Sequence, residues 1–130
     1  MKLYLDIDGV LLNYGGDSIA KHSIEFIDYV TNEFDCYWLT THCKGDSTPA
    51  IEYLSIYFPQ ETIEKLKRIK PTYREDLKTE GIDFDSNFIW LDDYPFQAEI
   101  AVLGNFGASE SLYRVNLANE DELHKVMEHL

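Results

Sequence analysis

The chain has 130 residues, of which 45% are hydrophobic and 14% aromatic, so it is long and apolar enough to bury a core and is not a disordered chain. Eleven Lys and Arg oppose 24 Asp and Glu, and the formal charge of −13 disfavours nucleic acid and anionic membranes as partners. Two cysteines are too few for a disulfide scaffold, and no apolar run approaches the roughly 18 residues of a membrane span. We therefore expect one cytoplasmic domain, residues 1–130, without membrane attachment.

The first half of the chain alternates predicted strands and helices. An apolar run at residues 3–7 predicts a short buried strand, and Asp17 or Ser18 can cap the helix that follows it. One buried stripe of that helix recurs every three or four residues, at Ile24, Ile27, Val30 and Phe34. Residues 36–40, "CYWLT", predict a second buried strand. Residues 48–69 then predict two short helices separated by Pro59.

The second half continues this alternation. Pro71 and Thr72 predict the start of a helix over residues 72–80, which Gly81 would end. Four further elements are expected: a strand at 87–91 ("NFIWL"), a helix at 95–103, a strand at 111–117 and a last helix capped by Asn119. Strands that alternate with helices predict an α/β fold, with a parallel sheet and helices on both of its faces.

Polar residues follow three of the predicted strands. They are Asp6 and Asp8 after the first strand, Thr40 and Thr41 after the second, and Asp92 and Asp93 after the third. Ligands of parallel α/β sheets bind beyond the carboxyl ends of the strands. The sequence therefore predicts that these side chains meet at one site.

Several carboxylates in one place repel each other unless a cation lies among them. Oxygen ligands of this kind suit Mg²⁺, which binds through one or two carboxylates together with a substrate phosphate. A hydroxyl and a lysine near the ion would help to neutralise that phosphate, and the candidates are Thr40 with Lys70 or Lys78. This set predicts a magnesium-phosphate site.

The spacing of Asp6 and Asp8 suits phosphoryl transfer. Residues i and i+2 of an extended strand point to the same side, so both carboxylates can address one phosphate. One carboxylate can act as a nucleophile that forms an aspartyl-phosphate, and the other as the general acid and later the base. Gly9 lets the backbone turn away without crowding the ligand, and we expect Gly9, Thr40 and Thr41 to contact the substrate.

The segments "DIDGVL", "YWLTT", a lysine and "FIWLDD" resemble the four ordered motifs of the haloacid dehalogenase-like (HAD) phosphohydrolase superfamily, and in particular its small capless members. This resemblance implies a three-layer Rossmann-like fold without a cap. It also implies that Asp6 is the nucleophile and a metal ligand, and that Asp8 is the acid/base and offers its carbonyl to Mg²⁺. Thr40 would bind phosphate, and Asp92 and Asp93 would complete the metal site.

The lysine of the third motif has two candidates. The superfamily pattern favours Lys70 in "IKPTYREDL", whereas the capless relatives favour Lys78 in "LKTEGIDF". A continuous helix over residues 72–80 would point Lys78 away from the site, and a new turn starting near Thr79 would bring it back. We prefer Lys78 and keep Lys70 as the alternative.

The expected function is Mg²⁺-dependent hydrolysis of a phosphomonoester. One helix fills most of the chain between Asp8 and Thr40, which leaves no room for a large lid. Such an open site suits either a small phosphomonoester or a phosphate at the end of a large molecule, and the charge of −13 favours the small molecule over nucleic acid. The alternatives are a catalytically weak phosphate-binding or regulatory module of the same fold and a phosphatase of nucleic-acid ends. A receiver-like signalling module fits less well, because its adjacent acidic pair should come early in the chain.

The remaining candidates have simpler explanations. His42 and Cys43 lack further His or Cys partners in the sequence, so we interpret them as ordinary loop residues. An aromatic group near the short helices is interpreted as packing; it consists of Tyr53, Tyr57 and Phe58.

Overall fold

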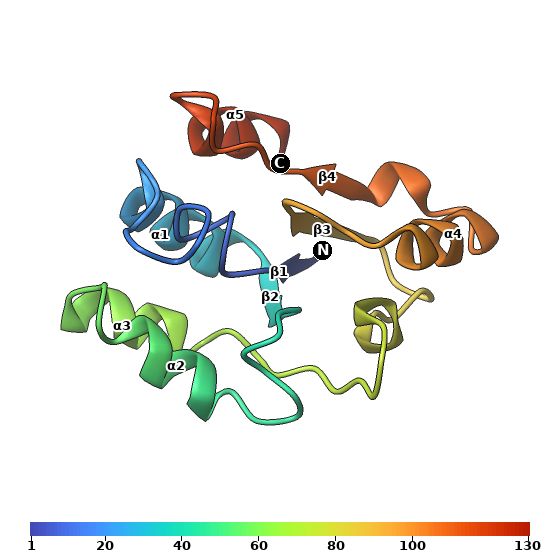
Figure 1. Cartoon of the computed structure of the whole chain (residues 1–130), viewed down its shortest axis with the longest axis horizontal. Helices are drawn as coiled ribbons and strands as arrows, with labels where there is room; N and C mark the ends of the chain where they lie inside the picture. The colour runs from blue at the N-terminus through green and yellow to red at the C-terminus, as the bar shows by residue number, and fades with distance from the viewer.

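The computed structural model describes all residues from 1 to 130 and shows an α/β fold built on one parallel sheet (Figure 1). The strands are β1 (Lys2–Leu5), β2 (Asp35–Trp38), β3 (Phe88–Asp92) and β4 (Leu112–Arg114). Their order in the sheet is β2-β1-β3-β4, and every neighbouring pair is parallel. The predicted α/β class and parallel sheet are therefore confirmed.

Five α-helices connect or follow these strands. They are α1 (Ser23–Glu33), α2 (Thr48–Leu54), α3 (Gln60–Leu66), α4 (Gln97–Asn105) and α5 (Glu122–His129). Two short 3₁₀ turns, Lys78–Gly81 and Ser109–Ser111, complete the elements. The prediction of two short helices around Pro59 is confirmed, because α3 begins directly after this proline. No helix combines the length and the apolarity needed to cross a bilayer.

The helix after β1 begins later than expected. Asp17 and Ser18 lie in a loop, and α1 starts only at Ser23. In this loop the Asn13 N–H donates to the Ser18 carbonyl at 2.8 Å, and the Ala20 N–H donates to the Leu11 carbonyl at 3.0 Å. The first bond occupies the Ser18 carbonyl, which a helix starting at Asp17 or Ser18 would have paired internally.

The predicted helix over residues 72–80 is wrong. The Thr72 carbonyl accepts a hydrogen bond from Gly45 N–H at 2.7 Å, and the Thr72 hydroxyl donates to the Trp38 carbonyl at 2.5 Å. Bonds to the end of β2 and to the loop that follows it therefore replace helical bonds in this segment. A helical turn forms only from Lys78 to Gly81, where the Glu80 side chain accepts from the Leu77 N–H at 2.9 Å.

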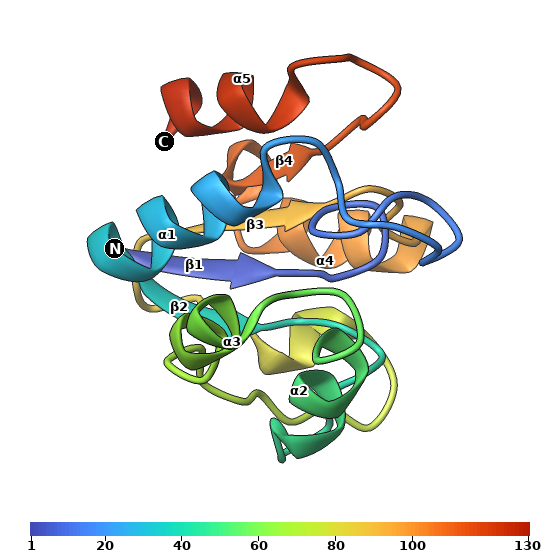
Figure 2. The same ribbon diagram turned by 90° about the vertical axis from the view of Figure 1, so that its left-hand side faces the viewer.

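Alternate residues of the strands enter two separate hydrophobic clusters. Leu3 and Leu5 join a large cluster that includes Phe26 of α1 and Val126 of α5. Tyr4 joins a smaller cluster; its other buried members are Leu39, Ile82, Phe88, Trp90 and Leu103 of α4. Both views show α4 across the sheet from α1 (Figures 1 and 2). The sheet is therefore buried from both sides, as its apolar strands require.

The topology reverses direction between β1 and β3. The chain moves from β1 to β2 on one side, then crosses to β3 on the other side of β1, and continues outward to β4. Such a reversal opens a crevice at the carboxyl ends of the two central strands. Asp6 follows β1 directly, and Asp92 is the last residue of β3, so the sheet brings these two carboxylates to that crevice.

Candidate active site

Three carboxylates converge at this crevice. Asp6, Asp92 and Asp93 each contribute one carboxylate oxygen to a group in which all oxygens lie within 4.8 Å of one another. Asp6 and Asp92 are buried, with exposures of 8% and 1%. Burial of several acids in one place is costly unless a cation compensates them, so the cluster has the character of a cation site.

Gly9 makes room for one of these acids. It has a left-handed backbone with φ of 83°, and a Cβ atom added to it would lie 2.2 Å from Asp93 Oδ2. Any other residue would therefore be strained in its backbone and would also displace the Asp93 carboxylate. The glycine after the "DID" segment is needed for the shape of the acidic cluster.

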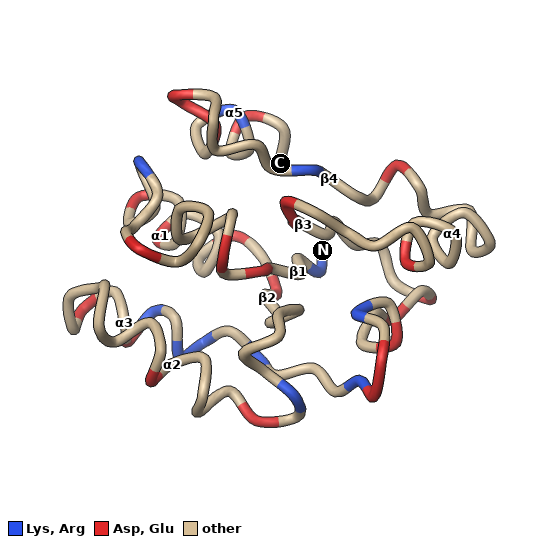
Figure 3. Tube along the Cα trace, in the orientation of Figure 1, with Lys and Arg blue, Asp and Glu red and all other residues tan.

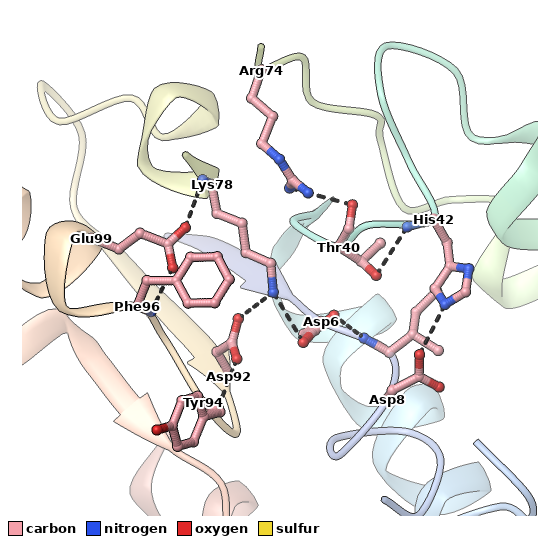
Figure 4. Close-up of polar contacts among 11 residues, drawn as sticks. Asp6, Asp8, Thr40, His42, Arg74, Lys78, Asp92, Tyr94, Phe96 and Glu99 are labelled. Atoms are coloured by element: carbon pink, nitrogen blue, oxygen red, sulfur yellow. Dashed lines mark hydrogen bonds and ion pairs between the residues drawn. The ribbon is translucent and has the colours of Figure 1, made fainter. Parts of the chain in front are cut away.

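Lys78 lies between two members of the cluster (Figure 4). Its Nζ atom is 3.1 Å from Asp6 Oδ2 and 2.7 Å from Asp92 Oδ2. Lys70 instead pairs with Asp35 at 2.8 Å, at the opposite end of the sheet where β2 begins. Of the two lysines, the structure brings only Lys78 to the carboxylates, because the helical turn starts at Lys78 rather than at Thr72.

The electrostatics of the cluster reflect burial and crowding. Burial raises the pKa of Asp6 to about 6, with a further contribution from Asp92 and an opposing one from Lys78. Burial and the neighbouring Asp92 also raise the pKa of Asp93. Burial alone would lower the Lys78 pKa, but Asp6 and Asp92 outweigh this effect and raise it. When all groups are ionised, three carboxylates and one ammonium leave a charge of −2.

The main chain of Lys78 is held by a buried acid that the sequence did not point to. Glu99 Oε2 accepts a hydrogen bond from the Lys78 N–H at 2.7 Å, while Oε1 accepts one from the Phe96 N–H at 2.8 Å. Glu99 is only 2% exposed. Its bond to Phe96 is half of a helix capping box, a pattern visible in sequence, but its bond to Lys78 requires the fold. Glu99 thus links the start of α4 to the turn that carries Lys78.

Asp8 lies beside the cluster and has its own partners. His42 Nε2 is 2.9 Å from Asp8 Oδ2, and the Tyr53 hydroxyl donates to Asp8 Oδ1 at 2.8 Å. The rings of His42 and Tyr53 stack with their centroids 4.0 Å apart. The structure therefore places His42, expected to be an ordinary loop residue, and Tyr53, expected to be packing, on a candidate catalytic group. No local signal reveals this contact, because it joins the loops after β1 and β2 with α2.

The loop after β2 supplies Thr40 and Thr41. Thr40 is buried and lies close to Asp6 in the crevice (Figure 4), whereas Thr41 is exposed. Arg74 Nη1 lies 3.4 Å from the Thr40 carbonyl, which adds a second cation that the sequence did not single out. Cys43 is buried in the large hydrophobic cluster, which agrees with a structural residue. Both cysteines are free thiols.

A groove of about 540 Å³ adjoins the acidic cluster. Gly9 and Asp93 line it together with Tyr14, Arg114, Val115, Asn116, Leu117 and Ala118. Acidic residues occur along most of the chain (Figure 3). Three cations nevertheless lie in or near the site: Lys78 beside Asp6 and Asp92, Arg74 beside Thr40, and Arg114 in the lining of the groove. With a divalent cation bound at the acidic cluster, the groove could accept a small anionic molecule.

In comparisons with known proteins, no family model matches the chain, and neither the curated proteins nor the solved structures give a match.

Proposed function

We propose that this protein is a Mg²⁺-dependent phosphomonoester phosphatase with a capless, three-layer HAD-like fold. The observation that carries the proposal is the position of Lys78, whose ammonium lies between Asp6 and Asp92 beside Asp93. With Asp93, the site has three carboxylates and one ammonium, so it needs a divalent cation; once that cation is bound, the cation and the Lys78 ammonium could together hold an anion. A metal phosphate provides both the cation and the anion.

The donor set fits Mg²⁺. All three candidate side chains offer hard carboxylate oxygens, and the net charge of −2 matches a divalent ion. Both oxygens of Asp92 already accept hydrogen bonds, from Lys78 Nζ and from the Tyr94 N–H. Asp93 receives no such donor, which supports direct binding by Asp93. Asp6 also accepts two hydrogen bonds, from the Ile7 N–H and Lys78 Nζ, so one of these bonds would give way to the ion, and we propose that Asp92 binds through water. Asp6 and the Asp8 carbonyl would complete the ligands. When bound, Mg²⁺ would neutralise charge on the phosphoryl group.

The proposed reaction has two displacements at phosphorus, and different side chains act in each. An Asp6 oxygen attacks phosphorus, the bond from phosphorus to the leaving oxygen breaks, and Asp8 gives that oxygen a proton. Water next attacks the aspartyl-phosphate, Asp8 takes a proton from the water, and the bond between Asp6 and phosphorus breaks to release phosphate. Lys78 and the Thr40 hydroxyl hold the phosphoryl oxygens, and His42 with Tyr53 orients Asp8.

The expected substrate is a small phosphorylated molecule. A groove of about 540 Å³ beside Asp93 falls within the size range of small-molecule sites. The charge of −13 opposes a long polyanion such as nucleic acid. Two free thiols support a reducing compartment such as the cytoplasm.

The test is hydrolysis of p-nitrophenyl phosphate with Mg²⁺ or with EDTA, by the parent chain and by Asp6→Asn. We expect release of nitrophenol that requires Mg²⁺ and vanishes in Asp6→Asn, because that substitution removes the nucleophile and a metal ligand together. Release by Asp6→Asn equal to that of the parent would refute the role of Asp6. A folded parent that binds Mg²⁺ and phosphate without turnover would instead support the phosphate-binding alternative.

A further inference from the structure

A second group of potential metal ligands lies where the start of α1 meets α5, outside the acidic cluster. His22 directly precedes α1, Glu25 lies in its first turn, and His124 belongs to α5. One ligand atom of each residue lies within 4.8 Å of the other two. A fourth donor is adjacent, because Asp121 Oδ1 is 3.1 Å from His22 Nε2.

The two imidazole rings of this group lie face to face. Their centroids are 3.6 Å apart and their planes differ by 18°. His124 Nε2 also lies 3.0 Å from Glu25 Oε2. Simple ion pairing accounts for two separate His–carboxylate contacts, but two imidazolium cations stacked at this distance would repel each other. Metal ions bind imidazole in its neutral form, so binding of one ion by both rings would remove that repulsion.

The backbone of His22 points to a role for its side chain. It is the only residue other than glycine with a positive φ, at 67°, a conformation that is costly for a residue with a Cβ atom. Its carbonyl accepts the Phe26 N–H at 2.9 Å, and glycine would provide that bond at lower cost. Glycine has no side chain, so it could not make the contacts of the His22 imidazole with His124 and Asp121.

We propose that His22, Glu25, Asp121 and His124 form a site for a transition-metal ion of the zinc type. Two imidazoles and two carboxylates suit such an ion, and two neutral rings with two carboxylates would leave it electrically neutral. Zn–N and Zn–O bonds of about 2.0–2.2 Å require ligand atoms about 3–3.5 Å apart, closer than the present limit of 4.8 Å. Each Zn–N bond also lies in the plane of its imidazole, so the stacked rings must turn out of their parallel arrangement, which requires side-chain rotations. Glu25 and His124, with side-chain exposures of 62% and 39%, are free to make them. Lys21, which lies 3.4 Å from Asp121, would turn to Glu120 alone, its partner at 2.9 Å.

Such an ion would join two loops that border the proposed active site. His22 ends the loop after β1, which contains Gly9, and Asp121 ends the loop whose residues 115–118 line the groove. The ion would also fasten α5 to α1. The site is nevertheless independent of the phosphatase proposal, because its donors are none of the residues assigned to phosphoryl transfer.

The test is a Zn²⁺ titration of the metal-free chain by calorimetry in millimolar Mg²⁺, which keeps the acidic cluster occupied. We expect one Zn²⁺ per chain, a rise in melting temperature on binding, and visible absorption of a tetrahedral complex when Co²⁺ replaces Zn²⁺. His124→Gln should weaken Zn²⁺ binding at least about tenfold. His129→Gln, a matched change of an exposed histidine in the same helix, should leave it unchanged.

Two further variants separate loss of a Zn²⁺ ligand from misfolding and from binding at the acidic cluster. Glu25→Gln changes a largely exposed side chain, so it should fold normally and still weaken Zn²⁺ binding. Asp93→Asn should alter Mg²⁺ binding and leave Zn²⁺ binding as it was. Absence of Zn²⁺ binding by the parent, equal binding by His124→Gln and Glu25→Gln, or loss of binding in Asp93→Asn alone would each overturn the site.

Discussion

Lys78 and Asp6 stand 72 positions apart in the chain, yet the Lys78 ammonium lies 3.1 Å from Asp6 Oδ2. Both groups are largely buried, with side-chain exposures of 14% and 11%. The same ammonium also contacts Asp92, so one cation serves two acids from neighbouring strands. Both buried acids therefore share Lys78 as their charge partner.

Replacing Lys78 with Ala should lower phosphatase activity by about 100-fold or more, because Lys78 is the one side-chain cation paired with both Asp6 and Asp92. It should also destabilise the chain in EDTA by about 3 kcal/mol, since two buried carboxylates lose their partner. Lys70→Ala breaks only an exposed pair with Asp35 and should change stability by less than about 1 kcal/mol and leave activity near that of the parent. Steady-state kinetics and denaturant unfolding measure both effects. Equal, mild losses in the two variants would mean that neither lysine binds the phosphate.

Gly9→Ala should impair Mg²⁺ binding, whereas Gly15→Ala should not. Both glycines have left-handed backbones, with φ of 83° and 87°, so both substitutions should cost about 1–2 kcal/mol of stability. Only at Gly9 would the new Cβ meet Asp93, since Gly15 has no atom within 4 Å of that position. Calorimetric Mg²⁺ titration should show a loss of at least about tenfold in affinity for Gly9→Ala alone. Similar Mg²⁺ affinity in both variants would show that Asp93 is not a ligand.

The elevated pKa of Asp6 predicts how stability responds to pH without metal. Its folded-state pKa of about 6 exceeds the ordinary value of 3.8, so the folded chain binds the proton more tightly than the unfolded one. The resulting stability is present below pH 3.8 and is lost as the pH rises through 6. In EDTA, Asp6→Asn should therefore gain stability relative to the parent as the pH rises from about 4 to about 7.

Mg²⁺ should offset this loss in the parent. Its effect on the melting temperature should grow over the same pH range, because the ion binds the ionised carboxylates, and it should be much smaller in Asp6→Asn. Thermal unfolding with Mg²⁺ and with EDTA measures both trends. A pH-independent stability difference between the parent and Asp6→Asn in EDTA would contradict the burial argument.

Tyr53→Phe should slow turnover more than Tyr57→Phe. The Tyr53 hydroxyl donates to Asp8 at 2.8 Å, whereas the Tyr57 hydroxyl donates to the Gly16 carbonyl at 2.6 Å. Removing the first bond leaves the acid/base group less well oriented, and we expect kcat to fall about tenfold with little change in KM. Both variants keep their rings, so folding should be comparable. Equal kcat values for the two would show that Tyr53 acts only in packing.

Much of the site could be predicted because its signals are local. Apolar runs that end in acids mark buried strands with polar carboxyl ends, and a parallel sheet brings those ends together. Asp6, Asp92 and Asp93 converge for this reason. The contacts of His42, Tyr53 and Arg74 had no such signal, because they depend on where loops and short helices come to rest against the sheet.

By itself, the sequence determined the α/β class and the clustering of the acids. Hydrophobic periodicity and the ends of strands can both be read from residues that lie within a few positions of one another in the chain. For the lysine, the sequence left two candidates open, with Lys78 preferred from the resemblance, and only the tertiary structure shows that Lys78 joins the acids. Local preferences favoured a helix from Thr72, but bonds from Thr72 to Trp38 and Gly45 hold that segment in a different conformation. The helical turn is thereby delayed to Lys78 and its side chain is aimed at Asp6. Long-range hydrogen bonds outweighed helix propensity there. Propensity contributes only a few tenths of a kcal/mol per residue, which is less than the roughly 0.5–1.5 kcal/mol that one hydrogen bond contributes to stability.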